Sequence, residues 1–233
     1  MNRKPFKKLL DSYIYFKILE ILNSNQRRKL DESNDLEFYA SPKFVYHLDS
    51  NFRKELTNTY NEEFCSNSTV LDLMSSWDSY LPTKKNYKKV IGHGLNKEEL
   101  ERNKYFDKYW IQNFNKDQNI PLESDSIDYC LMVAAWQYLQ YPENIATEIA
   151  RILKSNGKLI IAFSNRAFWT KAPNIWTNSD ENQRVDYVRS VLISNGFNEP
   201  KVIKKFVSNS LKIFPFLNSD PFYCLISQKK SKN

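Results

Sequence analysis

Hydrogen-bonding residues gather in four short segments, each directly after an apolar stretch of the chain. The segments are residues 72–78, 92–96, 113–115 and 133–137. If each apolar stretch is a parallel strand, the four segments meet at the carboxyl edge of one sheet, where open α/β sheets bind ligands. The candidate ligand-binding residues are Asp72, Met74, Ser75, Ser76, His93, Gly94, Asn96, Asn113, Phe114, Asn115, Val133 and Ala134.

The chain has two histidines, which limits its acid–base chemistry. His47 is the one weak candidate for a catalytic base, because imidazole titrates near neutral pH. The alternative is a structural role between Tyr46 and Leu48. His93 either covers a bound nucleoside or is a surface turn residue.

Metal and nicotinamide chemistry have no support in the spacing of residues. Two remote histidines and three scattered cysteines form no ligand pattern, so no metal site is expected. The turn after the first strand lacks the G-x-G-x-x-G sequence that cradles a pyrophosphate. The odd, scattered cysteines also argue against a disulfide framework and favour a cytoplasmic location.

Apolar strands alternate with helical patterns from about residue 36. The predicted strands are 69–74, 89–92, 109–113, 127–133, 158–163, 201–207 and 222–227, and the predicted helices are 51–64, 97–104, 142–153 and 182–195. Gly157 and Gly196 are expected to end the last two helices. Such alternation predicts a mainly parallel sheet with crossover connections, and the turn residues before the last strand predict an antiparallel final pair.

Residues 1–35 have a different character. Apolar residues at three-to-four spacing predict an amphipathic helix over residues 5–23, followed by a polar linker to residue 35. No secretory signal is expected, because the apolar stretch is interrupted by charges. The helix either packs on the core or makes peripheral contact with a membrane surface. The domain proper is predicted to span residues 36–233.

The positive charge of the chain is concentrated at its beginning. Of the net charge of +7, +6 falls within residues 1–30, which hold eight Lys or Arg and two acids. The remainder is close to neutral, whereas enzymes acting on nucleic acids carry a positive field around the active site. No nucleic-acid partner is therefore expected.

An ordered set of segments resembles the class I S-adenosylmethionine-dependent methyltransferases, of the small-molecule kind called methyltransferase type 11. The segments are residues 70–73, 90–92, 120–129 and 148–159, the last with Glu148, Arg151, Leu153 and Gly157 in the family's order. Residues 44–49, 163–166 and 171–172 resemble a cyanobacterial and plastid branch of the superfamily. The similarity covers about residues 38–228.

The resemblance implies a Rossmann-like three-layer α/β/α sandwich with a seven-stranded, mostly parallel sheet of order 3-2-1-4-5-7-6 and an antiparallel last strand. It implies S-adenosylmethionine as the cofactor and methyl transfer to a small molecule. No invariant catalytic residue is implied, since the sulfonium is already a strong electrophile.

The chain departs from the family's pattern at the cofactor loop. Residues 74–77 contain no glycine, and the position of the usual ribose-binding acid falls on Gly94. Asn96 and Asn115 could replace acids by neutral hydrogen bonding. Two interpretations follow: an active enzyme with a variant site, or a catalytically silent methyltransferase fold that acts as a binding or scaffold module.

Four further residues are weak candidates for contact with the methyl acceptor. Trp77 and Trp136 stack on a flat ligand or close the top of the core. Arg166 and Lys171 follow the fifth strand, where they bind an anionic or aromatic acceptor or belong to a solvated basic loop. A third functional interpretation is a peripheral membrane enzyme anchored by residues 5–23.

Overall fold

A computed structural model describes residues 20–206 and 219–231 of the chain. Most of the predicted amphipathic helix (5–23) lies outside these residues, and so does Val207 at the end of a predicted strand. The described residues 20–23 are not helical. Membrane contact through this segment therefore stays a prediction. Among the described residues, no helix is both long enough and apolar enough to cross a bilayer.

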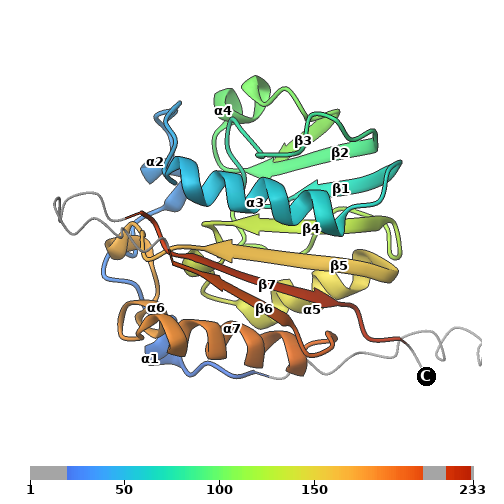
Figure 1. The fold of residues 1–233 in the computed structure, drawn as a ribbon. Coiled ribbons are helices and arrows are strands. Elements are labelled where there is room, and N and C mark those ends of the chain that lie inside the picture. Colours follow the sequence, from blue (N-terminus) through green and yellow to red (C-terminus); the bar gives the residue numbers. More distant parts are fainter. Residues whose placement is uncertain (1–19, 207–218, 232–233) are drawn as a thin grey trace, which may run out of the picture.

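Seven strands form one sheet in the order β3-β2-β1-β4-β5-β7-β6 (Figure 1). The strands are β1 (Ser68–Asp72), β2 (Tyr87–Gly94), β3 (Lys108–Ile111), β4 (Ile127–Val133), β5 (Leu153–Phe163), β6 (Lys201–Lys205) and β7 (Phe222–Gln228). The first five run parallel, and β7 pairs antiparallel with both of its neighbours. The predicted order and the antiparallel last strand are confirmed.

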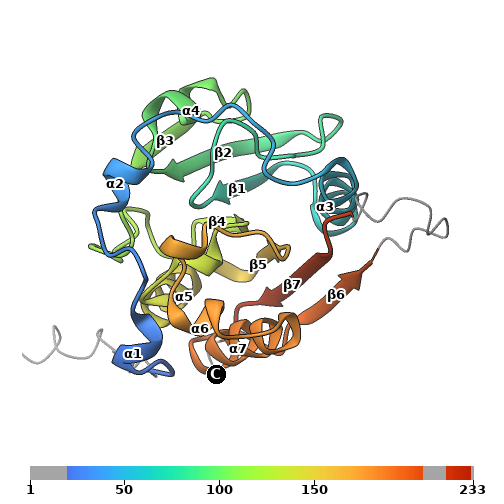
Figure 2. The ribbon, with the colours of Figure 1, turned by 90° about the vertical axis from the view of Figure 1, so that its left-hand side faces the viewer.

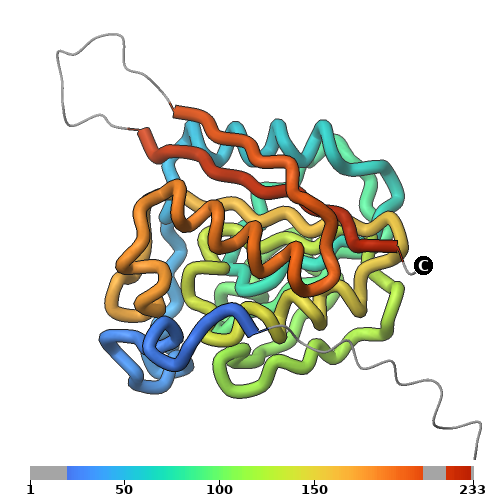
Figure 3. Tube along the Cα trace, turned by 90° about the horizontal axis from the view of Figure 1, so that it is seen from below, coloured from blue at the N-terminus to red at the C-terminus, as the bar shows by residue number. Residues whose placement is uncertain are grey.

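Both faces of the sheet are apolar because helices cover both. Alternate residues of β4 and β5, such as Leu131 and Ile160, pack with the buried side of α3 (Ser50–Glu63). Their neighbours Cys130 and Ile161 pack on the opposite face. There α5 (Pro142–Ile152) and α7 (Glu181–Ser194) lie side by side (Figure 3). Alternation with period two thus builds the three-layer sandwich.

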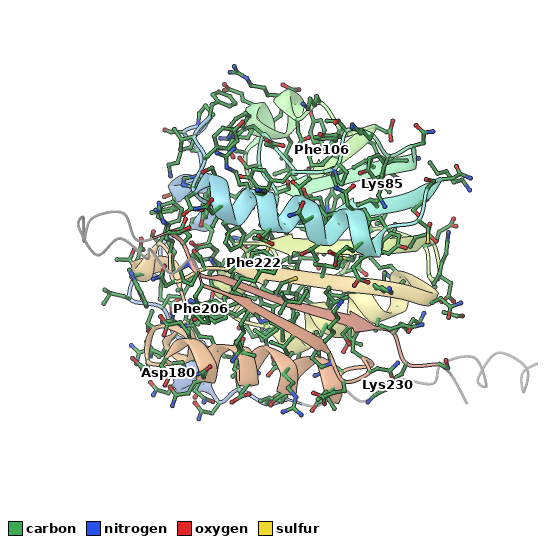
Figure 4. The ribbon with its side chains drawn as sticks, viewed as in Figure 1. Lys85, Phe106, Asp180, Phe206, Phe222 and Lys230 are labelled. Atoms are coloured by element: carbon green, nitrogen blue, oxygen red, sulfur yellow. The ribbon has the colours of Figure 1, made fainter. Side chains whose placement is uncertain are left out.

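Phe222 shows how the last strand joins the α3 layer. It begins β7 and is labelled in Figure 4. Its ring meets the ring of Phe52 in α3 edge-on, with 4.9 Å between the ring centroids. Edge-to-face contact of buried rings adds stability beyond the area that they bury. The antiparallel strand is therefore held by its pairing with β5 and by this helix.

Several predicted boundaries differ from the structure. β1 ends at Asp72 rather than Met74, because Met74 turns into the left-handed region with φ 54°. α5 ends at Ile152 and β5 starts at Leu153, so Gly157 lies within a strand and does not end the helix. Gly196 follows α7 with φ 96°, as predicted for a helix stop. The connection between β1 and β2, residues 73–86, contains no helix.

Short helices complete the chain. They are α1 (Ser24–Arg27), α2 (Asp35–Phe38), α4 (Lys97–Arg102), the 3-10 turns η2 (Trp136–Tyr138) and η3 (Trp169–Lys171), and α6 (Asn174–Thr177). Most of them were not predicted, since elements of three or four residues carry no periodic pattern.

Residues 20–49, here called the N-terminal strap, run along the carboxyl ends of the parallel strands. Figure 2 looks onto these ends and shows the strap in blue, from α1 past α2 towards α3. Residues 23–35, predicted to be a polar linker, contain α1 and a buried ion pair. Lys29 and Asp35 are buried and paired, with Nζ 2.8 Å from Oδ1. Buried ion pairs therefore hold the strap together with the buried side chains of Leu22 and Leu48.

Glu143, at the start of α5, is the first anchor of the strap. Its fully buried carboxylate accepts hydrogen bonds from the backbone N–H groups of Ile21 and Leu22, both at 2.9 Å. Both oxygens also accept from the Arg27 guanidinium, at 2.9 and 3.0 Å. These bonds keep the pKa of Glu143 below its usual value despite the burial.

Replacing Glu143 by Gln is expected to lower the free energy of unfolding by about 3 kcal/mol, because the partly buried Arg27 guanidinium loses its fully buried counter-charge. Chemical denaturation measures this change. Glu62→Gln, on the exposed side of α3, is the matched control and should change stability by less than about 0.5 kcal/mol. Equal effects of the two substitutions would contradict the anchoring role.

Candidate functional site

A cavity of about 680 Å³ lies at the carboxyl ends of the parallel strands, under the strap. This volume is typical of small-molecule sites. Most predicted cofactor residues line it: Asp72, Met74, Ser75, Ser76, Gly94, Asn96, Asn113, Phe114, Asn115, Val133 and Ala134. His47, Arg166 and Lys171 line it as well. His93, Trp77 and Trp136 do not.

The loop after β1 passes unusually close to the end of β2. The Ser75 N–H donates to the His93 carbonyl at 2.7 Å. A Cβ placed on Gly94 would lie only 2.6 Å from the Ser75 carbonyl oxygen. No side chain fits at position 94, and this explains why the acid expected there is absent.

Two turns at this edge use left-handed backbone without glycine. Met74, two residues after the end of β1, has φ 54°, and Ala134, directly after β4, has φ 50°. Such conformations are uncommon for residues with a side chain, and they concentrate at functional sites. The glycine-free loop thus makes its turn at Met74 and leaves the cavity open, and Trp77 lies outside the lining.

Asp72 presents a buried carboxylate at the end of β1. It accepts the Ser75 hydroxyl at 2.6 Å, and no described Lys or Arg forms an ion pair with it. Burial raises the pKa of Asp72 to about 7, although hydrogen bonds from Ser75 and Ser79 act in the opposite direction. The Asp72 carboxyl therefore titrates near neutral pH and lacks a cation.

The asparagines of the site divide into two kinds. Asn96 donates to the Tyr39 and Ala40 carbonyls, both at 2.9 Å, and its side-chain oxygen caps α4. Asn115 donates to Asp35 and to the Tyr138 carbonyl. Both side chains hold the strap or a loop. Asn113 differs, because its buried Nδ2 has no hydrogen-bond partner among the described residues.

His93 lies beneath the cavity floor rather than in it. Its Nδ1 accepts the Met74 N–H at 3.1 Å, and its Nε2 lies 2.9 Å from the Gln112 carbonyl. The ring stacks on Phe114 at 4.0 Å between centroids. Burial lowers the pKa of His93 to about 4, so it is neutral at pH 7 and supports the loop. It is not a surface turn residue.

The two tryptophans also lie away from the cavity. Trp136 is buried in the core on the α5 face of the sheet. Trp77 packs on Tyr46, with 4.7 Å between ring centroids, and its Nε1 donates to the Val45 carbonyl. The structure thus gives Trp136 a core position and Trp77 a contact with the strap.

The two predicted acceptor cations are already paired. The Lys171 ammonium is buried and donates to the Ser33 carbonyl and hydroxyl, at 2.9 and 2.8 Å, with Asp31 at 3.1 Å. Arg166 pairs with Asp220 at 2.5 Å. Lys171 therefore anchors the strap, and Arg166 joins the strand ends to the segment before β7.

His47 stands at the exposed rim of the cavity, within the strap. Its ring meets Phe168 edge-on at 5.6 Å. Partial burial and the nearby Lys43 ammonium lower the pKa of His47, so its ring is neutral at pH 7 and can accept a proton. Its position leaves both the catalytic and the structural interpretation available.

Comparison with known proteins agrees with this geometry. Residues 76–161 match the model of a methyltransferase domain family. A chain of the Haloferax volcanii complex between the Trm112 methyltransferase activator and a methyltransferase is 17% identical, with a TM-score of 0.57 over 78% of this chain and 92% of that one. A SAM-dependent methyltransferase from Thermotoga maritima is 20% identical, with a TM-score of 0.54 over 78% and 90%.

The chain has the fold of the class I S-adenosylmethionine-dependent methyltransferases. A search of curated protein sequences gave no match. The cyclase SpnF is also similar in fold, with 11% identity and a TM-score of 0.56 over 85% of this chain and 91% of that one. The methyltransferase fold therefore does not settle the reaction, and the site must carry that argument.

Several residues of this methyltransferase-fold site were missed from the sequence. Tyr39, Lys43, Glu99, Tyr138 and Phe168 all line the cavity. The aromatic residues of the strap were the sequence feature that could have indicated these lining residues. The polar composition of residues 23–35 favoured a linker instead. Glu99 accepts hydrogen bonds from the Ser76 hydroxyl at 2.5 Å and from the Lys43 backbone N–H at 2.7 Å, and so joins the loop after β1 to the strap.

The buried Asp72 carboxyl should make stability depend on pH. Its folded pKa, about 7, exceeds the ordinary value of 3.8, so its contribution is fully present below pH 3.8 and is lost as the pH rises through 7. At pH 8 the ionised group costs about 4 kcal/mol. Asp72→Asn should therefore be more stable than the unmodified chain at pH 8, and this advantage should disappear near pH 4.

Urea denaturation at several pH values measures the difference between the two proteins. A difference that stays constant from pH 4 to pH 8 would show that Asp72 is ionised throughout this range.

Proposed function

We propose that the chain is an S-adenosylmethionine-dependent methyltransferase that acts on a small molecule. The observation that carries the proposal is the buried Asp72 carboxylate, which has no described cation partner and lines a cavity of about 680 Å³. A buried carboxylate without a cation is costly. A ligand that brings a positive charge to it would remove that cost.

The residues present fit such a cofactor. Asp72 would hold the ammonium group of its methionine part, since the β1 end is the acidic end of the cavity. Asn113 and Gln137 line the cavity, and the buried Nδ2 of Asn113 and Oε1 of Gln137 have no hydrogen-bond partner among the described residues. After a small rotation of each side chain, these atoms would offer a donor and an acceptor to a purine and its ribose. At the β2 end Gly94 lines the cavity with backbone alone, and the Ser75 carbonyl fills the space that a Cβ would need there.

When bound, S-adenosylmethionine supplies a methyl group already activated by its sulfonium. The chain's own residues then have to orient the two reactants and exclude water. The strap covers the carboxyl ends of the strands, and Lys171 and Glu143 hold it there. For an acceptor that binds in its protonated form, the neutral ring of His47 in the cavity lining would take the proton.

A second candidate is a catalytically silent binding module. The engagement of Asn96 and Asn115 in holding the strap favours it, because neither side chain is free to replace the missing acids. Cofactor binding separates the two candidates.

Calorimetric titration with S-adenosylhomocysteine is expected to show saturable binding, and Asp72→Ala should weaken it at least about tenfold by removing a charge-assisted contact. Asp186→Ala, on the exposed side of α7, is the control and should bind like the unmodified chain. Absence of binding at millimolar ligand would favour the silent module.

The affinity for S-adenosylhomocysteine should also rise with pH. Binding of an ammonium group requires ionised Asp72, and its pKa of about 7 in the free protein leaves it mostly protonated at pH 6. Between pH 6 and pH 8 the affinity should therefore increase about tenfold. Titrations in this range measure the change, and Asp72→Asn should abolish it. An affinity that is independent of pH would exclude direct pairing with Asp72.

A further inference from the structure

Lys43, in the strap, carries a charge that the described structure leaves without an anion. Its ammonium lies over three aromatic rings, 4.9 Å from the centroid of Phe38, 5.6 Å from Tyr39 and 5.0 Å from Phe168. Ring faces attract a cation. They offer no acceptor to its three N–H groups, and no described carboxylate is paired with this ammonium.

The other cations of the cavity lining have partners. Lys171 is surrounded by Asp31, Ser33 and Asp35, and Arg166 is paired with Asp220. His47 is neutral at pH 7, partly because the Lys43 charge opposes its protonation. Within the described cavity lining, Lys43 is therefore the cation available to a ligand.

Further aromatic rings lie next to the ring cluster around this ammonium. The Phe168 ring meets His47 edge-on at 5.6 Å and lies nearly parallel to Tyr138, 6.2 Å away with 29° between the planes. Burial raises the pKa of Tyr138 to about 12, so its phenol stays neutral. Rings in this arrangement suit contact with a planar ligand.

The cavity is thus polarised. Asp72 gives the β1 end a negative character, while Lys43 and the Phe168 cluster add a positive and aromatic surface on the side of the strap. The Glu99 carboxylate on this side accepts hydrogen bonds from the Ser76 hydroxyl and the Lys43 backbone N–H. We propose that the methyl acceptor is a planar organic anion, and that Lys43 is the residue that selects its charge. The proposal rests on the methyltransferase function proposed above.

An anionic acceptor also fits a site that has few groups able to accept a proton. The acceptor oxygen, as a carboxylate or phenolate, forms the new bond to the methyl carbon with its own electron pair. The sulfur–carbon bond breaks, and its electron pair stays on sulfur. The positive charge of the sulfonium and the negative charge of the acceptor cancel, and no proton needs to be removed.

The test compares two probes of the same shape, 2-naphthoate and its uncharged amide 2-naphthamide. Their dissociation constants are measured by tryptophan fluorescence, with and without saturating S-adenosylhomocysteine. The unmodified chain should prefer the anion about tenfold, the size expected for one charge-assisted contact. Lys43→Met keeps the stem on the rings but should abolish the preference, whereas Lys43→Arg should retain it.

Lys54→Met, on the exposed side of α3, is the control and should leave the preference unchanged. Equal affinities for the two probes, no saturable binding of either, or a preference that survives Lys43→Met would overturn the acceptor proposal. A preference that depends on Lys43 in a chain that binds no S-adenosylhomocysteine would refute the methyltransferase function alone. S-adenosylhomocysteine binding without a charge preference would refute the acceptor assignment alone.

Discussion

The close passage of the β1 loop over the end of β2 determines the rest of the site. The hydrogen bond from Ser75 to the His93 carbonyl fixes the loop against β2, and the 2.6 Å approach at Gly94 excludes a side chain there. The same turn brings the Ser75 hydroxyl to Asp72. One backbone contact therefore excludes the acid expected after β2 and positions the Asp72 carboxylate at the β1 end of the cavity.

The strap depends on buried charges in a similar way. Glu143 and Lys171 lie on separate elements after β4 and β5, and each binds strap residues more than a hundred positions earlier in the chain. Removing one partner of such a pair leaves an uncompensated buried charge, so the pairs specify one position for the strap. This position places Lys43 and His47 at the cavity. Positioning of the site and stability of the fold therefore share the same ions.

The order of the strands could be predicted because each strand is a local apolar segment, and β4 was located at its true ends. The strap could not, since its polar residues become ordered only through partners remote in sequence. Trp136 shows a further limit: the sequence placed it at the active edge, but its side chain points into the core. Sequence position fixes the strand end at which a residue lies, while the direction of its side chain depends on the backbone turn, here the left-handed Ala134.

The distribution of charge argues for a bound ligand rather than for an inert scaffold. A fold that serves only as a scaffold has no reason to keep an ionisable carboxyl buried without a cation, because an apolar or amide residue at the end of β1 would be cheaper to bury. Here a carboxylate at the β1 end and an ammonium on the strap share one cavity, and each lacks a described counter-charge. A pair of ligands with the opposite polarity, cationic at Asp72 and anionic at Lys43, satisfies both groups at once. Transfer of a methyl group from a sulfonium to an organic anion brings together such a pair.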